Sequence, residues 1–133
     1  MSIKVRGYAA QSDSSPLAPF EFERREVRSN DVEIDIEYCG VCHSDLHQAK
    51  NDWGWSHYPM VPGHEIVGRV RRVGAGVSKF KAGDLVGVGC MVDSCQHCHP
   101  CEQGLEQYCE NGNVQTYNDT DRFGDNLQTY GGY

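Results

Sequence analysis

Four cysteines within fifteen residues constrain this chain more than any other feature of its sequence. Cys95, Cys98, Cys101 and Cys109 follow the spacing C-x2-C-x2-C-x7-C. Two cysteines at the shorter spacing can present their sulfurs to one ion from a tight turn, and zinc favours four sulfurs in closed structural sites. The residues between them are mostly polar, so metal binding would supply the folding free energy of this segment. The spacing predicts a zinc-binding lobe over residues 91–112.

Haem and iron–sulfur centres are the alternatives to zinc, and either one would make the chain an electron carrier. Cys39-Gly-Val-Cys42-His43 and Cys95-Gln-His-Cys98-His99 match the C-x-x-C-H pattern of haem attachment. Covalent haem attachment normally follows export, and it leaves Cys101 and Cys109 unexplained. Iron–sulfur motifs place a proline after the fourth cysteine, whereas here Pro100 precedes the third. Zinc is therefore the favoured metal.

Composition excludes several classes of partner. The formal net charge of −7 argues against binding to a nucleic-acid backbone. The longest apolar run, near residues 85–92, is interrupted by glycines and falls short of the ~20 residues of a membrane-spanning helix. No apolar export segment follows Met1, and an odd number of cysteines fits a reducing compartment. We expect a cytoplasmic protein with a small-molecule partner and no membrane.

Hydrophobic patterning predicts a mainly β chain with short helices. Residues 31–38 alternate polar and apolar side chains with period two, which predicts a half-buried strand with inward-facing Val32, Ile34, Ile36 and Tyr38. Residues 66–73 and 85–89 read as further strands, separated by glycine-containing turns. Many short strands between glycines indicate a barrel or sandwich.

Two less regular segments flank this pattern. A short helix is expected to start with Ser44 or Asp45 as its N-cap and to run through Gln48. The stretch from residue 113 to 126 is polar and is expected to be a loop.

A second group of metal-binding residue types comes from two separate segments. Cys42 lies in the first, and His64 and Glu65 follow Pro62-Gly63 in the second. Ligands from distant segments are typical of an open catalytic zinc site. Cys39-Gly-Val-Cys42 also imitates a thioredoxin-type redox pair, but no βαβ pattern surrounds it.

These motifs together resemble one family. Tyr38-Cys-Gly-Val-Cys-His-Ser-Asp-Leu-His47, Tyr58-Pro-Met-Val-Pro-Gly-His-Glu-Ile-Val-Gly68, Gly83-Asp-Leu-Val-Gly-Val-Gly89 and the four-cysteine lobe are similar to the zinc-dependent medium-chain alcohol dehydrogenases, most of all the cinnamyl alcohol dehydrogenase branch. The resemblance covers nearly the whole chain. It implies that residues 1–133 form a GroES-like β-barrel catalytic domain that carries the zinc lobe.

The resemblance also implies a role for individual residues. Catalytic zinc would be bound by Cys42 and His64, with Glu65 able to join them, while Cys39 would bind no metal. Asp45 would orient His64, Ser44 and His47 would relay the alcohol proton, and His43 would contact the cofactor pyrophosphate. The positions that would line the substrate pocket are Gln48, Trp53, Trp55 and Cys90.

The implied reaction is hydride transfer between a primary, cinnamyl-type alcohol or its aldehyde and NADP(H), in an enzyme that forms homodimers when complete. The resemblance implies a third catalytic cysteine and a Rossmann cofactor domain downstream, and this chain itself lacks the G-x-G-x-x-G fingerprint of such a domain. The isolated chain is therefore expected to be inactive. A non-enzymatic zinc-binding barrel module is the main alternative.

Overall fold

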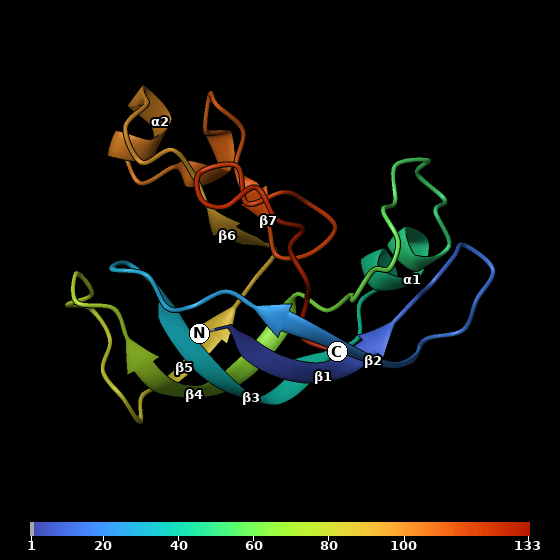
Figure 1. Cartoon of the computed structure of the whole chain (residues 1–133). Coiled ribbons are helices and arrows are strands. Elements are labelled where there is room, and N and C mark those ends of the chain that lie inside the picture. Colours follow the sequence, from blue (N-terminus) through green and yellow to red (C-terminus); the bar gives the residue numbers. More distant parts are fainter. Residues whose placement is uncertain (1) are drawn as a thin grey trace.

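The computed structural model describes residues 2–133 and contains three small antiparallel sheets with short helices between them (Figure 1). The elements are β1 (Ile3–Ala9), β2 (Ala18–Arg24), β3 (Val32–Gly40), α1 (His43–Ala49), β4 (Glu65–Val73), β5 (Leu85–Val88), β6 (Met91–Asp93), α2 (His99–Glu102), the 3-10 turn η1 (Glu106–Tyr108) and β7 (Val114–Gln115). None of the described helices has the length and apolarity to cross a membrane. The prediction of a mainly β chain with short helices is confirmed.

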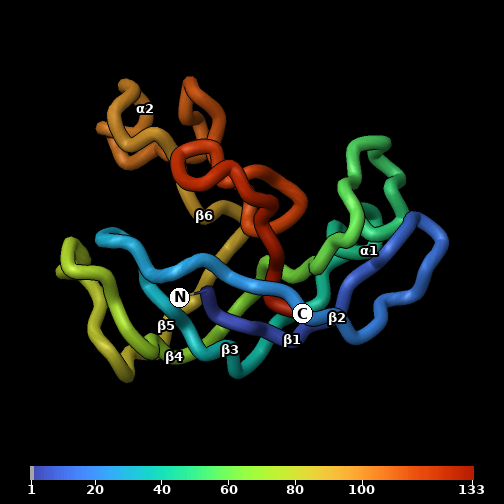
Figure 2. The backbone as a smooth tube through the Cα atoms, viewed as in Figure 1, coloured from blue at the N-terminus to red at the C-terminus, as the bar shows by residue number. Residues whose placement is uncertain are grey.

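The sheets β1-β2 and β3-β4-β5 form the strand layer at the base of the molecule in Figure 1. Backbone pairing between Ala10 and Met60, at 2.9 Å in both directions, connects the end of β1 to the segment before β4. The tube in Figure 2 shows the C-terminal segment descending from the lobe to this layer. The hydrophobic core is small, and Ala9, Met60 and Val61 are its fully buried members.

Tyr38 does not face inward as the alternating pattern predicts, and Ile36 is 42% exposed although it pairs with the buried Gly68. The register between β3 and β4 shifts between Ile36 and Tyr38, so one extra residue interrupts the alternation. Tyr38 therefore pairs with Val67 on the outward face of β4 and is 73% exposed. A single-residue bulge moves every following side chain to the other face, which periodicity alone does not reveal.

The helix α1 begins earlier than predicted, since its N-cap lies two residues before Ser44 and three before Asp45. Its N-cap is Cys42, whose backbone N–H donates to the Asp45 carboxylate at 2.9 Å. Asp45 is thus the third helical residue and Ser44 the second, so the prediction of either as the N-cap is wrong. The N-cap N–H has no acceptor within the helix, and an acidic side chain three residues later can accept its hydrogen bond. This arrangement is a capping box.

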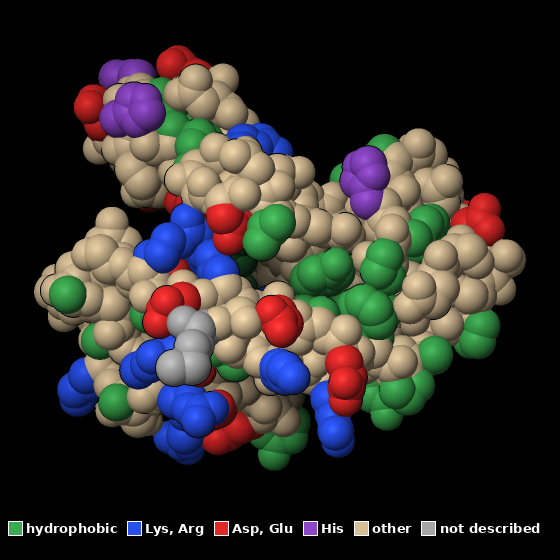
Figure 3. Space-filling model, in the orientation of Figure 1, with side chains coloured by type: hydrophobic (Ala, Val, Ile, Leu, Met, Phe, Trp, Pro, Cys, Tyr) green, Lys and Arg blue, Asp and Glu red, His purple; other side chains and the backbone are tan. Residues whose placement is uncertain are grey.

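The cysteine-rich lobe and the segment that contains α1 project from the strand layer, with a hollow between them (Figure 3). The strands β6 and β7 pair antiparallel and close the base of the lobe. The prediction of a plain polar loop over residues 113–126 is wrong at its start, where Val114 is fully buried in β7 and Thr116, Tyr117 and Asn118 are also buried.

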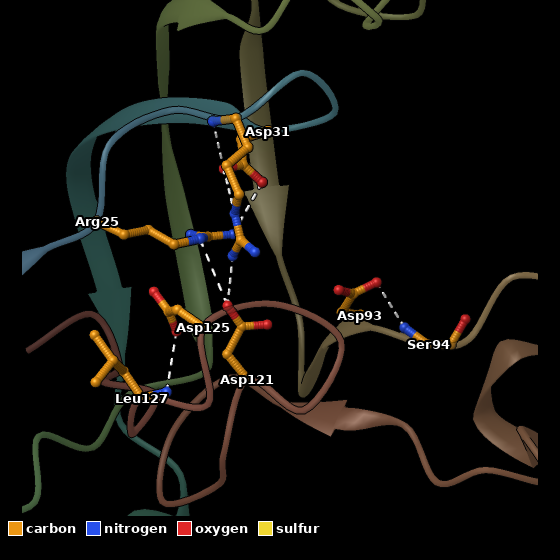
Figure 4. Close-up of polar contacts among 8 residues, drawn as sticks. Arg25, Asp31, Asp93, Ser94, Asp121, Asp125 and Leu127 are labelled. Atoms are coloured by element: carbon orange, nitrogen blue, oxygen red, sulfur yellow. Dashed lines mark hydrogen bonds and ion pairs between the residues drawn. The ribbon is translucent and has the colours of Figure 1, made fainter.

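Ion pairs tie the segment after the lobe to the loop between β2 and β3. Asp121 lies 2.5 Å from an Arg28 nitrogen and 3.6 Å from an Arg25 nitrogen. Figure 4 shows Arg25 between Asp31 and Asp121. Burial acts to raise the pKa of Asp121, but the hydrogen bond from Arg28 and the two positive charges hold that pKa below its usual value. This cluster fixes the returning chain against the strand layer.

Candidate active site

The four lobe cysteines lie around one point. Their sulfur atoms are all within 4.8 Å of one another, and Cys95 Sγ lies 3.9 Å from Cys101 Sγ. Four sulfurs placed 2.3 Å from a central zinc would be about 3.8 Å apart in a tetrahedron. Cys98 and Cys101 are buried at the two ends of the first turn of α2. The donor set and its spacing fit a closed zinc site.

Backbone N–H groups point at these sulfurs. The N–H of Cys95 donates to Cys109 Sγ, that of Cys98 to Cys95 Sγ and that of Glu110 to Cys98 Sγ, each at 3.4 Å. Burial acts to raise the pKa of Cys95, but hydrogen bonds from its neighbours, first the backbone of His97, lower it to about 6. Such donors stabilise thiolate charge, the form of cysteine that binds metal.

The pKa of Cys98, in contrast, is raised. A backbone hydrogen bond at Cys101 acts to lower it, but burial and the neighbouring Cys101 and Cys95 sulfurs prevail. Without a cation, the thiols of the cluster share protons because several thiolates so close together repel one another. A divalent cation at the centre removes that repulsion.

The second cluster, here called the open cluster, consists of Cys42, His64 and Glu65. One ligand atom of each lies within 4.8 Å of the others. Cys42 caps α1, whereas His64 and Glu65 stand at the start of β4. Thiol sulfur, imidazole nitrogen and carboxylate oxygen form a donor set that fits zinc. Among the described residues, Cys39 belongs to neither group of potential metal ligands.

Gly63 makes the turn into His64 sterically possible. Its φ of +104° lies in a region that other residues rarely adopt. A Cβ at this position would also lie 2.5 Å from the Tyr133 ring and 2.7 Å from Cys39 Sγ. Pro62-Gly63 therefore directs His64 toward Cys42 at a point where no side chain fits.

Asp45 connects the two segments of the open cluster and is only 2% exposed. Its Oδ1 accepts the Gly63 N–H at 3.0 Å and lies 3.3 Å from His64 Nδ1. Its Oδ2 accepts the N–H of Cys42 and, at 2.8 Å, the Tyr133 hydroxyl. Because Nδ1 faces this carboxylate, His64 has Nε2 available as its ligand atom.

A cavity of about 220 Å³ adjoins the open cluster. The structure places the four predicted pocket positions around it, together with Ser44 and His64. Three further lining residues that the sequence did not single out come from β7 and the chain after it. The full lining is Ser44, Gln48, Trp53, Trp55, His64, Cys90, Gln115, Thr116 and Tyr117.

Two pairs of stacked rings line this cavity. The rings of Trp53 and Trp55 stack at 6.1 Å with 15° between their planes. Tyr117 stacks on His64 at 5.7 Å. Gln48 is buried, and its side-chain amide donates to Ser56 at 2.6 Å. The cavity thus presents flat apolar faces beside a few fixed polar groups.

The predicted relay residues lie on α1. The Ser44 hydroxyl is 3.6 Å from Cys42 Sγ, so it lies at the edge of the open cluster. His47 stands one turn later, half exposed, with Nδ1 held at 2.8 Å by Asp52. His43 is exposed near the helix start, its ring 6.2 Å from that of His47. Of these three residues, Ser44 alone lines the cavity.

Sequence reasoning missed Tyr117 and Tyr133 at the open cluster. Burial, followed by the nearby Asp45 carboxylate, raises the pKa of both hydroxyl groups. Both residues lie far along the chain from Cys42 and His64, so no local spacing could have indicated them.

The chain matches the family model of the alcohol dehydrogenase GroES-like domain over residues 28–133. It is 55% identical over 133 residues to a probable mannitol dehydrogenase of Medicago sativa, which covers 100% of this chain and 36% of that protein. It is 57% identical over 116 residues to an aldehyde reductase of Escherichia coli, with coverage of 87% and 33%. The chain thus spans about a third of the length of these relatives.

Solved structures are similar in fold over the whole chain. The crystal structure of CAD from Helicobacter pylori complexed with NADP(H) superposes with a TM-score of 0.95 at 48% identity, over 100% of this chain and 38% of that one. A cinnamyl alcohol dehydrogenase from Sorghum bicolor gives 0.92 at 48% identity, over 97% and 36%. These likenesses confirm the predicted fold class, and the chain belongs to the alcohol dehydrogenase GroES-like domain family.

Proposed function

We propose that this chain is the catalytic-domain portion of a zinc-dependent alcohol dehydrogenase that interconverts a primary, cinnamyl-type alcohol and its aldehyde with NADP(H). The strongest support is the pairing of a closed four-sulfur cluster with an open cluster of Cys42, His64 and Glu65 beside a cavity. A closed site stabilises a fold, whereas an open one leaves a position for substrate.

The two proposed cofactors supply chemistry that side chains lack. When bound at the open cluster, zinc would supply Lewis acidity toward an alcohol or carbonyl oxygen, and NADP(H) would supply hydride exchange with the adjacent carbon. Cys42 and His64 are the proposed protein ligands, with Glu65 able to join them. Cys95, Cys98, Cys101 and Cys109 are the proposed structural ligands.

Ser44 and His47 handle the proton in this proposal. The Ser44 hydroxyl, at the cavity wall, accepts a hydrogen bond from the substrate hydroxyl and passes its proton toward His47. The imidazole of His47 is held by Asp52 and is half exposed, so it can release the proton to solvent. For aldehyde reduction the proton moves in the opposite direction.

The cavity walls support an aromatic or allylic substrate. Trp53 and Trp55 offer a stacked planar face, and such faces favour rings and conjugated chains. Gln48 and Cys90 complete the proposed pocket. The names of several relatives, cinnamyl alcohol dehydrogenases among them, point to the same substrate class.

The remaining parts of the proposal concern the complete protein. Residues 1–133 form its GroES-like domain, and a Rossmann domain outside this chain holds NADP(H), with His43 reaching the cofactor pyrophosphate. The H. pylori relative was crystallised with NADP(H), which favours this cofactor. Location in the cytoplasm is supported by seven free cysteines, which suit a reducing compartment. Homodimer formation is proposed from the family resemblance alone.

The test compares this chain with a protein extended through its natural downstream sequence, each assayed with cinnamaldehyde and NADPH. We expect turnover only in the extended protein, because holding the nicotinamide in reacting geometry is worth ~7–11 kcal/mol. Cys42→Ser in the extended protein should abolish turnover, while Cys39→Ser should retain it. Equal activity of the extended protein and its Cys42→Ser variant would refute the proposal, as would zinc-dependent turnover by the short chain.

A further inference from the structure

Tyr133 is fixed beside the open cluster by both its backbone and its ring. Its N–H donates to Pro62 O at 3.1 Å, and its carbonyl accepts the Tyr8 N–H at 3.2 Å. Gly131 and Gly132 make similar bonds, so the whole segment pairs with residues 61–63. The ring occupies the space where a side chain at Gly63 would be. These contacts give the phenol one defined orientation.

The phenol hydroxyl is directed at the carboxylate that joins the two halves of the open cluster. It donates to Asp45 Oδ2 at 2.8 Å and lies 3.4 Å from Gly40 O. The two oxygens of Asp45 thus divide their contacts. Oδ1 serves the His64 segment, through Gly63 N–H and His64 Nδ1, and Oδ2 serves the Cys42 N–H and Tyr133.

Through these contacts of Asp45, the Tyr133 hydroxyl can affect the orientation of the His64 imidazole. A carboxylate held by donors on both oxygens cannot rotate about its last bond without breaking them. Removal of the hydroxyl takes one donor from Oδ2, which leaves the Cys42 N–H there and Tyr117 as a further hydrogen-bonding neighbour of Asp45. The carboxylate plane is then less restrained, and so is the imidazole that Oδ1 orients. Groups that orient a metal-binding histidine are known to change metal affinity.

We propose that Tyr133 is a positioning residue of the open cluster, which acts through Asp45 to fix the imidazole of His64 for metal binding. This inference rests on the proposed function, because it takes the open cluster to be a metal site. The hydroxyl itself contacts neither substrate nor metal in this account.

The test is a Co²⁺ titration of the chain after its closed cluster has been filled with zinc. Tyr133→Phe keeps the ring against Gly63 and removes only the hydroxyl. Tyr130→Phe is the matched control, since its ring packs on Phe22 at 4.8 Å in the same segment. The readouts are the Co²⁺ dissociation constant and the visible d–d spectrum at saturation, with circular dichroism and retained zinc as checks on the fold.

We expect Tyr133→Phe to weaken Co²⁺ binding about tenfold, the lower end of the range for residues that orient a ligand. Its saturated spectrum should differ from that of the unmodified chain, because the ligand geometry is less restrained. Tyr130→Phe should match the unmodified chain in both. Wild-type affinity and spectrum in Tyr133→Phe would overturn this inference alone. Failure of the unmodified chain to bind Co²⁺ would overturn the open metal site and the inference with it.

Discussion

The two clusters of this molecule are built in opposite ways. The closed cluster takes four sulfurs from one stretch of fifteen residues, with a four-residue helix and a 3-10 turn as its only helical support. The open cluster takes a sulfur, a nitrogen and an oxygen from segments more than twenty residues apart in sequence. Its parts are joined by the buried carboxylate of Asp45. One site is local and depends on its ion, and the other depends on the surrounding fold.

This difference predicts how each site responds to damage. The lobe has little apolar core, so we expect its folding and its proposed metal binding to be one event. The open cluster stands on β4 and α1, which are held by the strand layer and by capping. Loss of its metal should leave the fold intact.

The largest effect is expected for Cys98→Ser or Cys101→Ser, the two buried lobe cysteines. Structural zinc contributes roughly 10–16 kcal/mol of apparent binding free energy in small zinc domains, and one lost thiolate forfeits much of it. Metal analysis should show loss of the tightly bound zinc, and limited proteolysis should cut within residues 91–112. Cys39→Ser serves as the control with unchanged metal content. Full zinc retention in both lobe variants would remove the basis for a closed site.

An intermediate effect is expected for Asp45→Asn. The amide keeps the shape of the side chain but replaces one acceptor oxygen by a donor, so it cannot serve both segments. Affinity of the open cluster for Co²⁺ should fall ~10–100-fold, while zinc in the lobe is retained. A parallel loss of the lobe zinc would show that the two sites are not independent.

The smallest effect is expected for Asp121→Asn, which removes the ion pairs to Arg28 and Arg25. Partly exposed ion pairs contribute about 0.2–1 kcal/mol to stability, so the free energy of unfolding at neutral pH should be only slightly lower in the variant. Because the pKa of Asp121 is lowered in the folded state, its contribution is present above the unfolded value of about 3.9 and disappears as pH falls through the folded one.

Urea unfolding at neutral pH and at about pH 3 measures this difference, because the carboxyl group of the unfolded chain, with a pKa of about 3.9, becomes largely protonated over that interval. The gap between Asp121→Asn and the unmodified chain should shrink at the lower pH. A gap that widens on acidification would show that Asp121 acts other than through its charge.

The same contrast explains what the sequence could predict. The lobe ligands are a linear motif, so their spacing indicated them directly, and period-two patterning indicated β3. The sheet of β1 and β2 was not predicted. The bulge before Tyr38 depends on how β3 pairs with β4 in the folded chain, and the alternation of polar and apolar residues does not indicate it. Cys42 as N-cap was hidden because serine and aspartate are the usual caps.

The surroundings of the open cluster were the hardest part to predict. Tyr117 reaches it from the chain that follows β7, a strand that pairs with β6, and Tyr133 reaches it because residues 131–133 pair with residues 61–63. This path of the chain is set by long-range packing and by the Arg28–Asp121 contact, neither of which leaves a periodic signal. Gly63 was noticed as part of a turn, but its contact with the Tyr133 ring required the structure.

The central claim is that the chain holds two metal sites of unequal strength, one closed and one open. The most direct measurement is zinc content per chain before and after dialysis against a mild chelator. We predict at most two zinc ions before dialysis and one after it, and the ion that remains should be absent from Cys98→Ser. Release of two zinc ions at the same chelator strength, or retention of the last ion in Cys98→Ser, would contradict this account.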